Sequence, residues 1–186
     1  IMSGAVCIFN PAADRGHAAQ KAHVLRSLAD DFGGAEWVMT ESTGHAVQIA
    51  EKAARGGYET VVALGGDGTA HEVINGLMSI PDGERPNFGI VPVGSGNDLA
   101  VNSGVSMDSE VAMEIALSGR PAALDVGVIS DGAGRTRYFG NVAGMLFDAA
   151  SLIHSVRITR LRGFPMYVAA VVRAIIENYD AVHVEI

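Results

Sequence analysis

Short apolar runs alternate with amphipathic stretches through the first 120 residues of the chain. Runs rich in β-branched and aromatic residues predict strands at 5–9, 36–40, 60–64 and 88–91. Apolar residues at helical spacing predict helices at about 14–32, 44–55, 70–77 and 107–118. Strands that alternate with helices indicate right-handed βαβ crossovers and a mainly parallel sheet. We therefore expect an α/β fold in this part of the chain.

The pattern changes near Pro121. Alternating segments at 123–129 and 135–142, joined by a turn at 130–134, predict an antiparallel hairpin. Helical patterns follow at about 147–155 and 164–178, and the last residues, 180–186, alternate as a strand does. We expect one domain at 1–120 and the start of an incomplete β-rich second domain at 121–186. A strand pattern at the end of the chain indicates a truncated protein. Its unpaired edge could invite association into a homo-oligomer as an artefact of truncation, so the oligomeric state stays open.

Charge and cysteine usage narrow the function classes. The net charge is −8 and the isoelectric point is about 5.1, which argues against a general nucleic-acid binder. A single cysteine, Cys7, excludes a disulfide framework and fits a reducing compartment. The sequence has neither an apolar run near the roughly 18 residues of a membrane span nor a signal-peptide pattern at its start. We expect a cytoplasmic protein without a transmembrane segment.

The most informative motif is a glycine turn at 65–69 (Gly-Gly-Asp-Gly-Thr), between a predicted strand and a predicted helix. Such a turn exposes backbone N–H groups at the positive end of a helix, which is a site for an anion such as phosphate. Asp67 would repel that anion unless Mg²⁺ stands between them, or it caps neighbouring N–H groups instead. Thr69 and Glu72 have capping-box spacing, which is the structural alternative for both.

Two further loops follow predicted strands. Residues 94–98 (Gly-Ser-Gly-Asn-Asp) form a second glycine turn, in which Ser95 and Asp98 have capping-box spacing. Asn10 follows the first strand, with Asp14 as a possible helix N-cap. Because the carboxyl ends of parallel strands share one edge, these loops predict a ligand crevice there.

These segments together resemble the diacylglycerol kinase catalytic domain family. The similar segments are Asn-Pro at 10–11, Gly-Gly-Asp-Gly-Thr-x-x-Glu-Val-x-Asn-Gly-Leu at 65–77, Pro-x-Gly-Ser-Gly-Asn-Asp-Leu-Ala at 92–100, and 139–149. The Gly-Gly-Asp-Gly core is shared with NAD kinases and phosphofructokinases, whereas 92–100 and 139–149 favour lipid kinases. Related sphingosine and ceramide kinases typically carry Ser where this chain has Gly65. The resemblance implies flavodoxin/phosphofructokinase-like layering in the first domain.

The resemblance also implies a function. The complete protein would be an ATP-dependent lipid kinase that phosphorylates the hydroxyl of diacylglycerol or a similar lipid at a membrane surface, with ATP and Mg²⁺ as cofactors. The catalytic base and a structural metal site would lie beyond the end of this chain, so no catalytic residue is assigned. Kinases for a sphingoid base, a polyprenol or NAD remain alternatives, as does a non-catalytic nucleotide- or lipid-binding regulatory domain.

The turns and the resemblance together assign an ATP site. Thr40 matches a family threonine near the nucleotide, Ser95 stands where the family commonly has Thr, and Asp98 is expected to order the second turn. The metal role is given to Asp67, indirectly through Mg-ATP. The residues assigned to ATP are Asn10, Pro11, Ala12, Ala13, Asp14, Thr40, Gly65, Gly66, Asp67, Gly68, Thr69, Glu72, Gly94, Ser95, Gly96 and Asn97.

Overall fold

The computed structural model describes residues 4–144, 147–158 and 164–178. The chain forms two compact units, the first ending at Asn141 and the second beginning at Val142. The strand expected at 180–186 lies outside the described residues. The division into units falls some twenty residues after the domain boundary expected near 120, because the hairpin that follows that boundary packs against the first unit.

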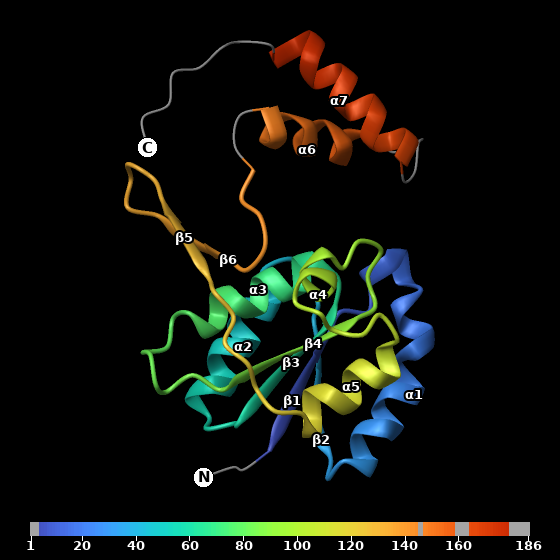
Figure 1. Cartoon of the computed structure of the whole chain (residues 1–186), viewed down its shortest axis with the longest axis vertical. Coiled ribbons are helices and arrows are strands. Elements are labelled where there is room, and N and C mark those ends of the chain that lie inside the picture. The colour runs from blue at the N-terminus through green and yellow to red at the C-terminus, as the bar shows by residue number, and fades with distance from the viewer. Residues whose placement is uncertain (1–3, 145–146, 159–163, 179–186) are drawn as a thin grey trace. The chain divides into compact units, whose positions relative to one another are not determined.

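A four-stranded parallel sheet forms the centre of the first unit (Figure 1). Its strands are β1 (Ala5–Phe9), β2 (Ala35–Met39), β3 (Thr60–Gly65) and β4 (Asn87–Pro92), in the order β2-β1-β3-β4. All three pairings are parallel and in register, so that Phe9 pairs with both Met39 and Leu64. The α/β prediction is confirmed, and the order is the flavodoxin-like one.

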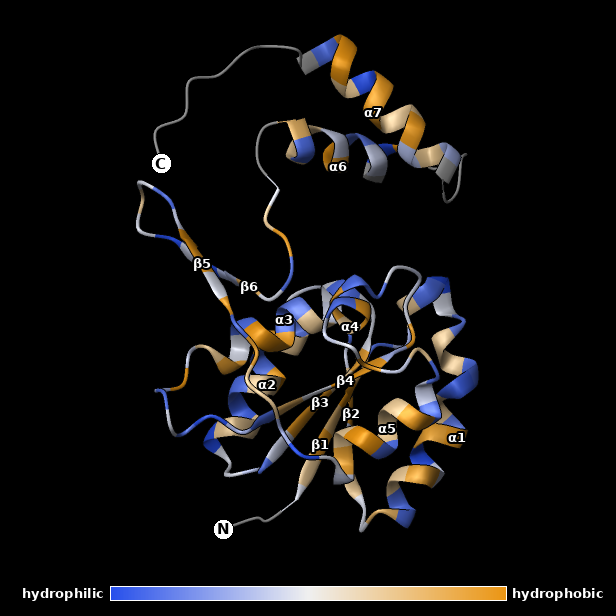
Figure 2. Cartoon of the chain, in the orientation of Figure 1, coloured by the Kyte–Doolittle hydropathy of each residue, from blue (hydrophilic) through white to orange (hydrophobic). Residues whose placement is uncertain are grey.

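Helices cover both faces of this sheet (Figure 1). Helices α2 (His45–Arg55) and α3 (Asp67–Leu77) pack on one face, and α1 (Ala18–Asp31) and α5 (Ser109–Ser118) pack on the other. Alternate residues of β1 belong to different cores: Val6 and Ile8 face α2 and α3, whereas Cys7 and Phe9 face α1 and α5. Figure 2 shows these apolar strands between helices of mixed polarity.

Cys7 lies in the second of these cores. Its side chain is fully buried, and burial raises the pKa of its thiol to about 12. Since the thiolate is the reactive form, we expect no reaction of the native protein with a thiol reagent at pH 8 and one equivalent after unfolding in guanidinium chloride. Reaction at similar rates in the two states would contradict this packing.

The hairpin expected after residue 120 is present, as β5 (Gly127–Ser130) and β6 (Thr136–Phe139) paired antiparallel. It belongs to the first unit and packs against α3 through β6. In the second unit, α6 (Phe147–Arg157) and α7 (Phe164–Asn178) pack against each other, as expected from their apolar periodicity. Among the residues described, no helix combines the length and apolar character that crossing a bilayer requires.

Several helix starts differ from the sequence expectation. The stretch expected to be helical from about residue 14 opens as a 3-10 turn, η1 (Ala13–Gly16), before α1, because Asp14, Arg15 and Gly16 have left-handed backbones with φ of 47°, 56° and 92°. Helix α3 begins three residues earlier than expected. A short helix, α4 (Asp98–Asn102), follows the second glycine turn and was not expected from the sequence.

Candidate phosphate-binding site

The candidate site lies where the strand order of the sheet reverses. The chain leaves β1 toward β2 on one side, whereas β3 continues to β4 on the other. Open α/β sheets bind ligands outside the carboxyl ends of the strands at such a reversal. Asn10 follows β1 and Thr69 follows β3, and the Nδ2 of Asn10 donates a hydrogen bond of 3.0 Å to the Oγ1 of Thr69. The loop after β1 and the first turn of α3 therefore meet at this point.

The N-terminus of α3 opens into this site. Its N-cap residue is Gly66, and no side chain caps it. The N–H of Ala70 is the first to bond back within the helix, at 3.1 Å from the carbonyl oxygen of Gly66. The N–H groups at 67–69 precede that first helical bond and lie at the positive end of the helix. A side chain on Gly68 would meet open space. These features together suit a phosphate group.

Asp67 connects the two glycine turns. Its Oδ2 accepts the N–H of Asn97 at 2.7 Å, and its Oδ1 accepts the N–H of Leu99 at 3.0 Å. The carboxylate therefore caps the start of α4, on a loop thirty residues away. Asp67 thus acts as a cap, as one of the two sequence hypotheses proposed, but it caps α4 rather than its own helix.

Asn97 orders the second turn from within. Asn97 has a left-handed backbone, with φ of 65°, and is only 7% exposed. Its side-chain amide accepts the N–H of Gly94 at 3.0 Å and donates to the carbonyl of Gly94 at 2.7 Å. Ser95 and Asp98 do not form the capping box that their spacing suggested, because α4 begins at Asp98 with Asn97 as its N-cap, and the bonds that cap α4 come from Asp67. Asp98 was expected to order this turn, but the hydrogen bonds that close it come from Asp67 and Asn97.

The glycines of the two turns allow their backbones to touch. A Cβ on Gly94 would lie 2.3 Å from the Cα of Gly66, and a Cβ on Gly96 would lie 2.8 Å from the Oδ2 of Asp67. Real Cβ atoms do not approach so closely, so a side chain at either position would push the turns apart. The two glycine turns are therefore one interlocked structure.

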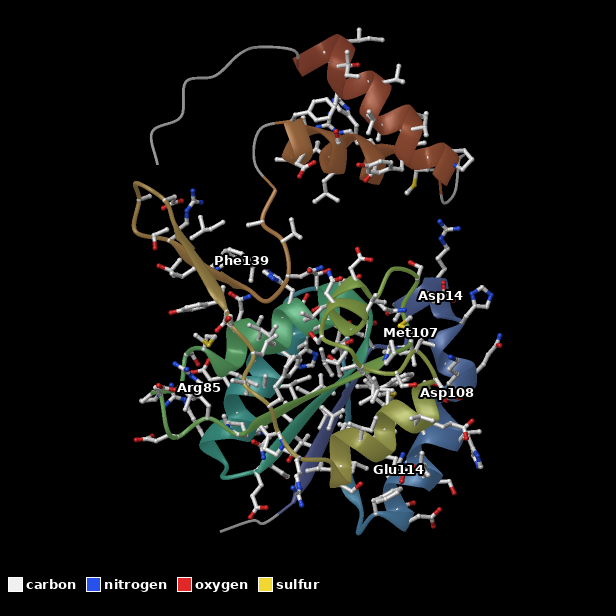
Figure 3. All side chains as sticks on the ribbon, in the orientation of Figure 1. Asp14, Arg85, Met107, Asp108, Glu114 and Phe139 are labelled. Atoms are coloured by element: carbon white, nitrogen blue, oxygen red, sulfur yellow. The ribbon has the colours of Figure 1, made fainter. Side chains whose placement is uncertain are left out.

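A pocket of about 290 Å³ lies over these turns. Ten of the sixteen residues assigned to ATP line it: Asn10, Ala13, Asp14, Gly66, Asp67, Gly68, Thr69, Gly94, Ser95 and Gly96. Figure 3 labels Asp14, which marks the side of the pocket formed by the segment after β1. That segment includes the left-handed residues Asp14 and Arg15, and strained backbone of this kind clusters at ligand sites.

The remaining six assigned residues do not line the pocket: Pro11, Ala12, Thr40, Gly65, Glu72 and Asn97. The N–H of Thr40 extends the sheet by donating to the carbonyl of Phe9 at 2.9 Å. Gly65 is the buried end of β3, where a Cβ would lie 2.3 Å from the Oγ1 of Thr69.

Glu72 stabilises a neighbouring helix. Its two carboxylate oxygens accept the N–H groups of Gly44 at 2.8 Å and Ala46 at 3.1 Å, at the positive end of α2. The alternative of a Thr69–Glu72 capping box is therefore wrong, because α3 starts before Thr69 and the Glu72 carboxylate reaches another helix. Both oxygens of the carboxylate are thus engaged at the start of α2, and Glu72 does not line the pocket.

The acidic groups of the pocket do not form a metal cage. Among the described residues, no three His, Cys, Asp or Glu side chains are grouped as metal ligands. Asp67 and Asp14 are the two carboxylates that line the pocket, and each oxygen of Asp67 already accepts an N–H group. This fits a magnesium ion held mainly by phosphate oxygens and water. The indirect metal role of Asp67 stays a prediction.

A second hollow, of about 360 Å³, lies between α1 and the start of α5, near Met107 and Asp108 (Figure 3). Asp108 already caps α5 there by accepting the N–H groups of Glu110 and Val111. The Nζ of Lys21 is 3.4 Å from the Oγ of Ser109. Although this hollow is larger, its helix end is capped by a carboxylate and has no glycine turn. The pocket at the strand reversal is therefore the better anion site.

Sequence reasoning missed the role of Asn75, inside the motif at 65–77. Its side chain bonds to the backbone of β6, across sixty-three residues of sequence. The sequence signal for this role is the position of Asn75 in the motif, about two helical turns after the N-terminus of α3. The partner of its amide is not readable from the sequence.

Comparison with known proteins places the chain in a family. Residues 4–129 match the model of the diacylglycerol kinase catalytic domain. The protein "Probable lipid kinase YegS-like" of Yersinia enterocolitica is 32% identical over 121 residues, which cover 65% of this chain and 40% of that protein. The protein of the same name from Chromohalobacter salexigens is 38% identical over 111 residues, which cover 60% of this chain and 34% of that protein.

A solved structure described as diacylglycerol kinases from Bacillus anthracis str. Sterne has the same fold. It matches with a TM-score of 0.57 at 24% identity, covering 63% of this chain and 44% of the solved chain. The chain thus spans less than half the length of the relatives named here. The matching family model extends over both glycine turns and the whole parallel sheet, and the chain belongs to the diacylglycerol kinase catalytic domain family.

Proposed function

We propose that the chain is the nucleotide-binding part of an ATP-dependent lipid kinase that phosphorylates the hydroxyl of diacylglycerol or a similar lipid. The observation that carries the nucleotide half is the uncapped N-terminus of α3, which opens into a pocket between two interlocked glycine turns. The lipid half rests on family membership and on the names of the relatives, which call them probable lipid kinases.

The phosphates of ATP would bind at the first turn of α3. Backbone N–H groups at 67–69 would contact phosphate oxygens, and Asn10, Ser95 and Gly96 would line the rest of the phosphate site. In phosphoryl transfer the protein mainly positions the reactants and neutralises charge. Bound Mg²⁺ would neutralise part of the negative charge of the phosphates. The chain's own contribution is a rigid set of dipoles fixed by Asp67 and Asn97.

The acceptor would meet ATP on the side of the β-rich domain. We propose that residues 121–186 begin this domain and that 1–120 form the nucleotide-binding domain. The oxygens of Asp67 are engaged by backbone N–H groups, which makes Asp67 unsuited to accept the proton of the acceptor hydroxyl. We assign the base to the part of the full-length protein that this chain does not cover. The enzyme would act as a peripheral protein at a membrane surface.

The test is an acceptor panel with the full-length protein and γ-labelled ATP. The panel contains diacylglycerol and a sphingoid base in mixed micelles, a polyprenol, and NAD. We expect Mg²⁺-dependent label transfer to diacylglycerol or a closely similar glycerolipid. Transfer to NAD alone would contradict the lipid-kinase proposal. Saturable ATP binding without transfer to any acceptor would instead indicate a nucleotide-binding regulatory domain.

A further inference from the structure

The outer edge of strand β6 is occupied by a side chain. In the hairpin, the N–H of Asp131 donates to the carbonyl of Arg135 at 3.0 Å, and hydrogen-bonded pairs alternate with non-bonded pairs from there. Tyr138, opposite Val128, is consequently in a non-bonded pair. Its backbone N–H and C=O point away from β5, toward the edge that faces α3.

The side-chain amide of Asn75 takes both of these backbone groups. Its Oδ1 accepts the N–H of Tyr138 at 3.0 Å, and its Nδ2 donates to the carbonyl of Tyr138 at 2.9 Å. The Nδ2 also donates to the carbonyl of His71 at 2.8 Å, one turn back in α3. A primary amide has two donor hydrogens and a carbonyl acceptor, so each of its functions is used here.

The side chain of Asn75 makes the two hydrogen bonds that a third strand beside β6 would make with Tyr138. The amide presents a donor and an acceptor side by side, as a strand residue does, and it therefore pairs with Tyr138 as a neighbouring strand would. Asp would offer acceptors only, and Ala would offer neither group. A two-stranded hairpin is marginal by itself, so its position depends on such a contact.

The hairpin and α3 are also closely packed around Asn75. A Cβ on Gly140 would lie 2.8 Å from the Cδ1 of Ile74, and the ring of Tyr138 packs against the core that contains α3. On the other side, a Cβ on Gly76 would lie 2.4 Å from the carbonyl oxygen of Val47, so α3 also sits tightly on α2. Helix α3 is therefore fixed on both sides.

The same helix thus begins at the phosphate pocket and ends at the hairpin. Gly68 and Asn75 are seven residues apart, or about 10 Å along the axis at 1.5 Å per residue. We propose that Asn75 is a positioning residue of the kinase. It fixes hairpin β5–β6, the first element of the segment that we assign to acceptor binding, relative to the bound phosphates. This inference rests on the proposed function. It predicts that losing the Asn75 contact slows transfer but spares ATP binding.

The test compares Asn75→Ala with Asn87→Ala in the full-length protein. Asn87 is the matched control. It is an exposed asparagine at the amino end of β4, whereas the pocket lies at the carboxyl ends of the strands. We expect Asn75→Ala to speed hydrogen exchange at the Tyr138 amide at least about tenfold and to lower kcat by about tenfold to a hundredfold. The KM for ATP should stay within about twofold of wild type. General destabilisation would not lower kcat while leaving the KM for ATP unchanged. Asn87→Ala should change none of these.

Asn75→Asp gives a second variant in case Asn75→Ala does not fold. It keeps an acceptor for the Tyr138 N–H but sets an oxygen against the Tyr138 carbonyl, and we expect the same fall in kcat. Unchanged exchange at Tyr138, or faster exchange with unchanged kcat, would overturn the inference. If the wild-type protein phosphorylates no acceptor, the proposed function fails, whereas faster exchange in Asn75→Ala still supports the hold on the hairpin.

Discussion

Asp67→Asn is expected to weaken Mg-ATP binding and thermal stability together. The Asp67 carboxylate accepts two backbone N–H groups from the second glycine turn and α4. An asparagine has the same shape but only one oxygen, so its NH₂ group would face one of these N–H donors. Hydrogen bonds to charged groups contribute about 1.5–3 kcal/mol each, and we expect a loss of roughly 3 kcal/mol in the free energy of unfolding.

The binding loss follows from the same contact. When Asp67 no longer joins the turns, the N–H groups at the start of α3 lose their fixed relation to Ser95 and Gly96 across the pocket. Preorganised donors lose much of their value when they must reorganise. We expect at least about tenfold weaker binding by calorimetry, because 1.4 kcal/mol corresponds to a factor of ten.

The magnesium dependence of nucleotide binding distinguishes an Asp67 that holds the two turns together from an Asp67 that acts through the metal. If the turn contact dominates, Asp67→Asn weakens binding of ADP without Mg²⁺ as well as binding of Mg-ATP, and it lowers the melting temperature. An unchanged melting temperature with a loss confined to the Mg²⁺-dependent part of binding would show that Asp67 acts through the metal instead. Gly132→Ala, in the exposed hairpin turn, is a control that should alter neither quantity.

Gly68→Val is expected to abolish detectable nucleotide binding in a protein that still folds. A Cβ on Gly68 meets no atom within 4 Å, and its φ is not in the left-handed region, so the fold accepts a side chain there. Gly68 also lines the pocket. A valine side chain would cover the N–H groups at the start of α3 and exclude the phosphates.

Gly68→Ala gives the graded version of this experiment. Glycine within a helix costs about 0.5–1 kcal/mol relative to alanine, so the alanine variant should melt at the same temperature or slightly higher. Its methyl group should still weaken Mg-ATP binding at least about tenfold, measured by calorimetry. Normal ATP affinity in a folded Gly68→Val protein would show that the phosphates bind elsewhere.

The parallel sheet and the place of the site were readable from the sequence for a physical reason. Buried parallel strands are continuous apolar runs, and the glycine turns directly follow the runs that became β3 and β4. Since all parallel strands end at one edge, Asn10 and both turns had to converge there. The segments at 92–100 and 139–149 then favoured the diacylglycerol kinase catalytic domain family, which the match over residues 4–129 shows.

The tertiary partners of single polar residues were not readable in this way. Glu72 has the spacing of a local cap, yet it caps α2, because α3 begins at Asp67 and turns Glu72 toward its neighbour. The helix expected from residue 14 starts late because Asp14 and Arg15 adopt left-handed backbones, which their side chains do not signal. Local spacing proposes a cap, but the packing of helices decides which N–H groups are within reach.

We expect nucleotide phosphates to bind at the N-terminus of α3, between the two glycine turns. The most direct test of this binding is to add Mg-ATP to the ¹⁵N-labelled protein and to follow the backbone amide resonances. We predict saturable shifts that are largest at 66–69 and 94–96 and small at Lys21 and Ser109, beside the other hollow. Saturable shifts centred on Lys21 and Ser109, with 66–69 unmoved, would contradict the account.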